Sequence, residues 1–234
     1  MDGSMLSDFG QALSEDYYVI IPTLHGMEGA EDTVFDSFDG ECESIEKYVD
    51  SELGGKLDYA YGISMGATTI YNLLQRDEIK IDKAILDGTY TANQGIFAAY
   101  MTSTNYYDFH VKALAGEDFD LGIMKIGCVL MGISEEEGKA FFTEDMTKNP
   151  MTFENMSRAS YANYTYQVDE NALVKNTEVV LWCGSEEPYA IKSHNIIKPH
   201  LENYTEKIFE GYGHGELISN HTEECLDLIK KECQ

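Results

Sequence analysis

The chain has 234 residues, of which 43% are apolar and 12% aromatic, which suits one large domain or a core domain with an insertion. Its 42 acidic and 16 basic residues give a net charge of −26, so we expect a surface that repels nucleic acid and anionic membranes and favours small or neutral substrates. The five cysteines fit no zinc motif, and no apolar run is long enough for a membrane span or typical of a signal peptide. The sequence therefore predicts a cytoplasmic protein with free thiols.

The first fifth of the chain predicts a helix, a strand, a loop and a second helix. Residues 5–13 carry apolar side chains at helical spacing. The run YYVIIP at 17–22 is apolar and rich in β-branched and aromatic residues, which indicates a buried strand. Residues 23–39 carry glycines and acids and are typical of a loop, whereas 42–53 predict an amphipathic helix that ends at Gly54.

The stretch LDYAYGISMGA at 57–67 predicts a strand, a sharp turn and the start of a helix. This is the order of a nucleophile elbow, in which the turn forces the serine into a strained backbone conformation and exposes its hydroxyl. Gly62 and Gly66 supply the small neighbours that such a turn needs. The pattern makes Ser64 a candidate nucleophile, with the helix N-terminus at Met65 directed at any oxyanion formed there.

Strands and helices alternate in the rest of the chain except in 89–175, where helical patterns rich in tyrosine and methionine occur without a clear strand. We interpret 89–175 as a helical cap inserted into a core made of 1–88 and 176–234, with the Tyr and Met side chains either packing on the core or lining an apolar pocket. The fold class is α/β, with a mostly parallel sheet covered by helices on both faces. The remaining expected elements are strands at 81–87, 177–183 and 205–209 and helices at 191–201 and 217–229.

A serine nucleophile needs a base, and histidine is the usual one because its pKa lies near neutrality. Of the six histidines, His214 follows the last expected strand in a glycine-rich turn, at the sheet edge where active sites form. The alternatives stand in an upstream loop or in helical, surface contexts; they are His25, His110, His194, His200 and His221. We therefore expect His214 to be the base.

An acid must orient that base and stabilise its protonated form. Glu186 and Glu187 both follow the preceding strand, and we prefer Glu187 because it stands directly before Pro188 and three residues after Gly184. Asp87, at the end of an earlier strand, is the outside alternative. The sequence alone leaves the choice between the two glutamates open.

The chain order Ser64, Glu187, His214 is that of nucleophile, acid and base in α/β-hydrolases. With the motifs YGISMGA, AILDGT, WCGSEEP and GYGHGE, the chain resembles a capped α/β-hydrolase of the serine esterase or lipase type. The resemblance covers most of the chain outside the insertion. It implies Ser64 as nucleophile, Glu187 as acid and His214 as base, and it makes residues 89–175 the cap between the sixth and seventh strands of the fold.

One part of the family pattern is missing. The family has a central strand ending in His-Gly, whose loop supplies one N–H of the oxyanion hole, while the residue after the nucleophile, here Met65, supplies the other. Met1 falls where that loop should be, and an interior gap would leave buried backbone groups unpaired at about 1–3 kcal/mol each. We expect the sequence to begin at an internal methionine of a longer protein. The alternatives are a sheet repaired in another way, or an alignment with 17–26 as the oxyanion strand and His25-Gly26 as its His-Gly.

The residues together predict a serine hydrolase that cleaves a small carboxylic ester through an acyl-enzyme on Ser64, without metal or cofactor. An incomplete oxyanion hole would lower its rate about 100- to 1,000-fold. Two other hypotheses remain: a non-catalytic protein of this fold that binds a small ligand, and a triad enzyme acting on an amide, a thioester or a C–C bond. In each case the expected partner is a small molecule, with no nucleic acid and no membrane.

Overall fold

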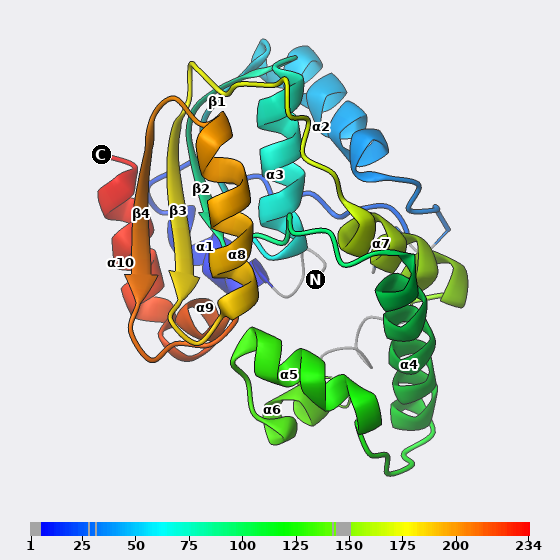
Figure 1. Ribbon diagram of the computed structural model, residues 1–234. Coiled ribbons are helices and arrows are strands. Elements are labelled where there is room, and N and C mark those ends of the chain that lie inside the picture. Colours follow the sequence, from blue (N-terminus) through cyan, green and yellow to red (C-terminus); the bar gives the residue numbers. More distant parts are fainter. Residues whose placement is uncertain (1–5, 28, 31, 142, 144–150) are drawn as a thin grey trace.

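The computed structural model describes residues 6–27, 29–30, 32–141, 143 and 151–234. In these parts of the chain, four parallel strands form one sheet in the order β1-β2-β3-β4 (Figure 1). Each strand lies within one residue of its predicted position, which confirms the expected parallel sheet. The strands are β1 (Lys56–Ile63), β2 (Lys80–Asp87), β3 (Glu178–Gly184) and β4 (Tyr204–Phe209).

Ten α-helices accompany the sheet in the described residues. They are α1 (Ser7–Leu13), α2 (Phe38–Leu53), α3 (Met65–Arg76), α4 (Ile96–Leu114), α5 (Lys125–Met131), α6 (Glu135–Ala140), α7 (Phe153–Thr165), α8 (Pro188–Ile197), α9 (Glu216–Asn220) and α10 (Thr222–Glu232). The helix α2 begins four residues before its predicted start because the Ser37 side chain caps it by accepting the Gly40 N–H. It ends as predicted at Gly54, which adopts the left-handed conformation. The expected C-terminal helix is two helices, divided at His221.

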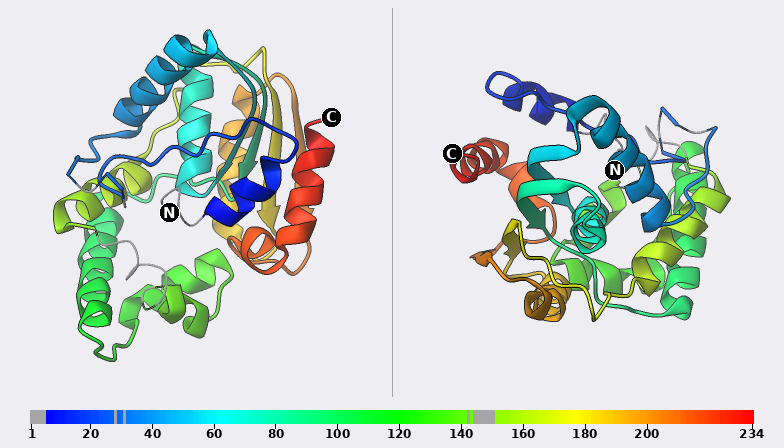
Figure 2. Two further views of the ribbon diagram at one scale, coloured as in Figure 1. Left: turned by 180° about the vertical axis from the view of Figure 1, so that it is seen from behind. Right: turned by 90° about the horizontal axis from the view of Figure 1, so that it is seen from above.

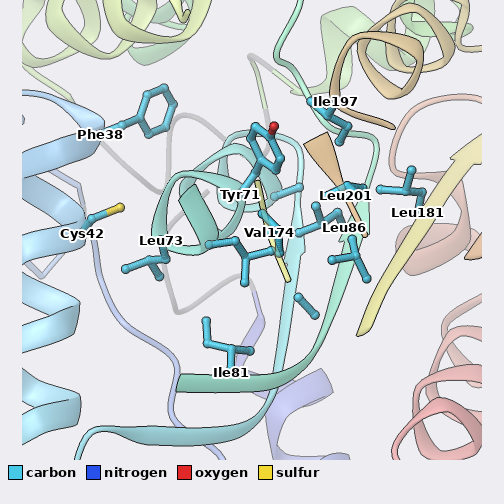
Figure 3. Packing of buried hydrophobic residues seen from close by; sticks show 14 of the residues in the cluster. Phe38, Cys42, Tyr71, Leu73, Ile81, Leu86, Val174, Leu181, Ile197 and Leu201 are labelled. Carbon is cyan, nitrogen blue, oxygen red and sulfur yellow. The ribbon is translucent and has the colours of Figure 1, made fainter. Parts of the chain in front are cut away.

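Both faces of the sheet are buried, and successive strand residues alternate between two clusters. One cluster joins the sheet to α2, α3 and α8, with Ala84 and Leu86 of β2 at its centre (Figure 3). The other joins it to α1, α9 and α10 through Ile85 of β2 and Trp182 of β3. Figure 2 shows the resulting layers from two further sides. This alternation explains why the strands are recognisable in the sequence as apolar runs.

The prediction of a buried strand at 17–22 is wrong. The segment has no strand conformation, and its side chains are at least partly exposed, Tyr18 being 82% exposed. The strand β1 has a strand partner only on its β2 side in the described residues. Residues 17–22 and β1 both line a cavity of about 980 Å³ that extends to Ser64. The rival alignment with an oxyanion strand at 17–26 is therefore wrong as well.

The helices α4 to α7 lie beyond the C-terminal ends of the strands (Figure 1). They have a small apolar cluster of their own, formed by Phe109, Phe119, Leu121 and Cys128. This is the helical part that the sequence predicted between 89 and 175. Nowhere in the described residues is a helix both long enough and apolar enough to cross a membrane.

Candidate active site

The turn between β1 and α3 has the geometry of a nucleophile elbow. Ser64 follows the last residue of β1, and its φ of 56° and ψ of −120° lie in a region that non-glycine residues rarely adopt. Its N–H donates to the Asp87 carbonyl at 2.8 Å, and its carbonyl accepts from the Thr68 N–H at 3.1 Å. These bonds hold the strained residue between the sheet and the first turn of α3, where it lines the cavity.

The structure describes only one of the two residues expected to supply an N–H to the oxyanion hole. Met65 is the first residue of α3, so its N–H has no acceptor within the helix, and Met65 lines the cavity. The other expected donor, Met1, lies outside the described residues.

Glu187 and His214, which lie 27 residues apart in the chain, form a short hydrogen bond. The distance from His214 Nδ1 to Glu187 Oε2 is 2.6 Å. The other carboxylate oxygen of Glu187 accepts the Gly184 N–H at 2.6 Å, and the residue is only 2% exposed. Glu186 is exposed instead, and no hydrogen bond joins its side chain to a described residue. The geometry therefore favours Glu187 over Glu186 as the partner of His214.

Contacts with the loops of the neighbouring strands hold the His214 turn in place. The His214 N–H donates to the Met131 carbonyl of α5 at 2.7 Å, which ties the turn to α5. A Cβ added at Gly88 would lie 2.9 Å from the His214 ring and 3.1 Å from Glu187 Oε2. A Cβ at Gly213 would lie 2.2 Å from the Gly132 carbonyl oxygen. Glycine at these positions allows the end of β2, the end of α5 and the His214 turn to meet at one point.

Ser64 and His214 line the same cavity. No hydrogen bond joins the Ser64 hydroxyl to His214 in the described residues. Catalytic hydrogen bonds of this kind often shorten only when substrate is bound, so the arrangement is compatible with a nucleophile and its base. The Tyr90 ring packs edge-on against the His214 ring, with centroids 5.3 Å apart, and limits the positions that the imidazole can take.

A further carboxyl group, Asp87, is buried behind the pair of Glu187 and His214. Asp87 ends β2 and is 4% exposed, and its Oδ2 accepts the Tyr61 hydroxyl proton at 3.1 Å. Burial raises the pKa of Asp87 to about 7, and the negative charge of Glu187 adds to the rise, whereas His214 and the Tyr61 hydrogen bond oppose it. The sequence left Asp87 as an alternative candidate for the acid, but the hydrogen bond of the His214 ring is to Glu187.

The raised pKa of Asp87 predicts a specific pH dependence of stability. Because the folded state holds the proton more tightly than the unfolded state, the stabilisation from protonated Asp87 is complete below about pH 4 and is lost as the pH rises through about 7. We expect the loss of the Asp87 proton to lower the free energy of unfolding by about 2–3 kcal/mol between about pH 5 and about pH 8. Urea unfolding of the wild type and of Asp87→Asn at both pH values measures it. If the two proteins lose equal stability over this range, the interpretation is wrong.

The other histidines have different environments. His194 is fully buried on α8 beside Glu206, and His110 is buried on α4, contrary to the surface position expected for it. His25 bonds Glu41, and His221 stacks on Tyr212. None of them lines the cavity that contains Ser64.

The wall that residues 89–175 contribute to this cavity is mostly apolar. Side chains from both the tyrosine and the methionine groups of the insertion reach it, while others, such as Tyr100 and Tyr161, are exposed. Some of these Tyr and Met side chains therefore line the cavity. Others pack against the core, such as Tyr166 against Phe38. The Tyr and Met side chains of residues 89–175 at the cavity are Tyr90, Tyr106, Met124, Met131, Met151, Met156 and Tyr164.

Comparison with solved structures finds the same fold along nearly the whole chain. An α/β-hydrolase family protein from Desulfitobacterium hafniense matches 98% of this chain and 90% of its own, with a TM-score of 0.84 and 21% identity. The esterase EaEST from Exiguobacterium antarcticum matches 99% of this chain and 87% of its own, with a TM-score of 0.72 and 15% identity. A thermophilic esterase from Thermogutta terrifontis matches 99% and 85%, with a TM-score of 0.73 and 12% identity.

No protein-family model and no curated protein sequence matches the chain. The structural neighbours are below 25% identity, so they establish the fold and not the substrate. The chain has the α/β-hydrolase fold, with a parallel sheet, helices on both faces and helices over the C-terminal ends of the strands. This agrees with the resemblance stated from the sequence motifs.

Proposed function

We propose that the protein is a serine hydrolase that cleaves small, uncharged carboxylic esters through an acyl-enzyme on Ser64. The observation that carries this proposal is the 2.6 Å bond between Glu187 and His214 at the cavity into which the strained elbow presents Ser64. A histidine fixed in one tautomer, beside a serine at a helix N-terminus, is the arrangement that nucleophilic catalysis requires. The structural neighbours described as esterases support the same class of reaction.

In the proposed mechanism, Glu187 accepts the Nδ1 proton of His214 and leaves Nε2 free to take the proton of Ser64. The Ser64 oxygen attacks the ester carbonyl, and the Met65 N–H binds the oxyanion that forms. His214 then returns the proton to the leaving alcohol. Water, activated by the same histidine, attacks the acyl-enzyme and releases the carboxylic acid and free Ser64.

The charges around the cavity support an uncharged substrate. The charged lining residues, apart from His214, are three acids and one base: Asp58, Glu137, Glu216 and Lys56. Lys56 is bound by Asp58 at 2.8 Å and by Asp82 at 2.7 Å, so its charge is already compensated. The described lining therefore offers no free cation for a carboxylate or phosphate group, and the net charge of −26 opposes the approach of anions.

A fluorophosphonate probe tests the proposal because it reacts with an activated serine and not with an ordinary hydroxyl. We expect one adduct per chain on Ser64, located by peptide mass spectrometry and suppressed by p-nitrophenyl butanoate, together with turnover of that ester. Ser64→Ala should lose both the adduct and the turnover. Ser219→Ala, which removes a hydroxyl that donates to the Gly215 carbonyl, should keep both.

An adduct on another serine, or undiminished ester cleavage by Ser64→Ala, contradicts the proposed nucleophile. Absence of both adduct and turnover from the folded wild type favours the non-catalytic binding protein.

A further inference from the structure

The outer face of the helix α4 carries large apolar side chains that are exposed to solvent. The opposite face packs against α7, and the buried residues of α4 are Ala99, Thr102, Ser103, Phe109 and His110. Figures 1 and 2 show α4 at the edge of the molecule, on the side away from β4. On the outer face, Phe97 is 76% exposed and Tyr100 is 62% exposed. Exposed apolar side chains gathered on one helix face indicate a contact with another molecule.

The exposed residues of α4 follow the spacing of a seam between two helices. Starting at Phe97, steps of three and four residues alternate along the helix. The positions reached in this way are Phe97, Tyr100, Thr104, Tyr107, Val111 and Leu114, and all of them except Tyr107 are exposed. Alternating steps of three and four residues keep side chains on one line of a helix, as in helices that pack side by side. These six residues are termed the α4 stripe.

The α4 stripe is complementary to itself when a second copy is turned by 180°. Its aromatic residues stand mainly in the first half of the helix and its branched aliphatic residues in the last turn. In an antiparallel pair of α4 helices with the axis between residues 105 and 106, each large ring therefore lies opposite a smaller side chain of the second copy. The opposed pairs are Phe97 with Leu114, Tyr100 with Val111 and Tyr107 with Thr104. A two-fold interface needs this property, because one patch serves both copies.

The α4 stripe also lies in a part of the chain with little charge. Between Asp87 and Asp108 there is no Asp, Glu, Lys or Arg, although the whole chain carries a net charge of −26. Within α4, Asp108 is bound by Lys112 at 2.7 Å, so the helix adds no net charge beside the stripe. Two copies repel each other over most of their acidic surfaces, but this repulsion is smallest where the two stripes meet.

The area of this face is sufficient for a dimer of moderate affinity. Beside the stripe, Ile96 and Phe153 are exposed as well, and the Phe153 ring lies edge-on to the Tyr107 ring with centroids 5.2 Å apart. The exposed parts of these apolar side chains amount to on the order of 600 Å² per copy. Standard protein interfaces bury about 800 Å² per partner, so the face approaches that size before its polar rim is included.

We propose that the α4 stripe is the interface between two copies of this chain, which form a two-fold symmetric dimer with their α4 helices antiparallel. None of the stripe residues lines the cavity that contains Ser64. The inference is therefore independent of the proposed ester hydrolysis, and variants of the stripe leave the residues of the candidate active site unchanged.

Sedimentation equilibrium of the full chain between about 1 and about 200 µM tests the dimer. We expect the mass to rise from the 26.3 kDa of one chain to twice that value over this range. Phe97→Glu should raise the dimer Kd at least about tenfold, because it places a carboxylate in the apolar seam. Val129→Glu makes a comparable change at an exposed residue of α5 and should leave the Kd within about threefold of the wild type. Circular dichroism verifies that each variant is folded.

A charge exchange across the two-fold axis tests the antiparallel arrangement itself. In the double variant Phe97→Glu with Leu114→Lys, each new carboxylate lies opposite a new ammonium group of the second copy. This variant should therefore dimerise at least about fivefold more tightly than Phe97→Glu alone. The proposal is overturned by a chain that stays monomeric up to about 200 µM, by equal effects of Phe97→Glu and Val129→Glu, or by no recovery in the double variant. A monomeric chain that binds phosphatidylcholine vesicles through Phe97 would assign the face to a lipid surface instead.

Discussion

Replacing Glu187 by glutamine should lower kcat for p-nitrophenyl butanoate about 10³- to 10⁴-fold. In the wild type, one Glu187 oxygen accepts the Gly184 N–H and the other accepts the Nδ1 proton of His214. If glutamine keeps its oxygen on Gly184, its amide N–H₂ faces His214 Nδ1. The imidazole must then carry its proton on Nε2, where it cannot accept the proton of Ser64.

Glu186→Gln is the matched control for this prediction. It makes the same chemical change one residue earlier, on an exposed side chain, and should leave kcat within about threefold of the wild type. Steady-state kinetics of the three proteins, with circular dichroism to verify folding, provide the measurement. Wild-type activity in a folded Glu187→Gln protein would contradict the role of Glu187, and a large loss in Glu186→Gln would transfer that role to Glu186.

The sequence predicts the positions of β2 and β3 because each carries an apolar run that is buried on both faces of the sheet. The shorter strand β4 is mostly exposed, and β1 alternates between apolar and polar residues. The prediction fails at 17–22, where the composition is equally typical of a strand. A strand also needs a partner edge, and whether one is available is a tertiary property that composition does not encode. In the described structure, residues 17–22 line a cavity together with β1 but do not pair with it, and Tyr18 is exposed to solvent.

For the candidate site, the sequence indicates the chain order of Ser64, Glu187 and His214 but not their geometry. Burial of Glu187 and exposure of its neighbour follow from the direction in which the chain enters α8, which the dipeptide of two glutamates does not reveal.

The two glycines of the elbow motif look equivalent in the sequence, but the structure separates them. A Cβ at Gly62 would lie 2.6 Å from the backbone carbon and oxygen of Gly66 and 2.7 Å from Ile70 Cδ1. A Cβ at Gly66 has no described atom within 4 Å of it. Only Gly62 is therefore required by the close approach of β1 and α3, whereas Gly66 faces open space in the cavity.

This difference predicts opposite effects of the same substitution. Gly62→Ala should destabilise the fold by about 3 kcal/mol or more, because the clash is with backbone that cannot move aside without displacing the helix. Gly66→Ala should be neutral or stabilising by up to about 1 kcal/mol, because alanine favours the helical conformation that residue 66 has in α3. Urea unfolding at one pH measures both. If both variants destabilise the fold equally, the elbow needs a small residue at both positions, as the sequence motif alone suggests. The space beside Gly66 would then not be open in solution.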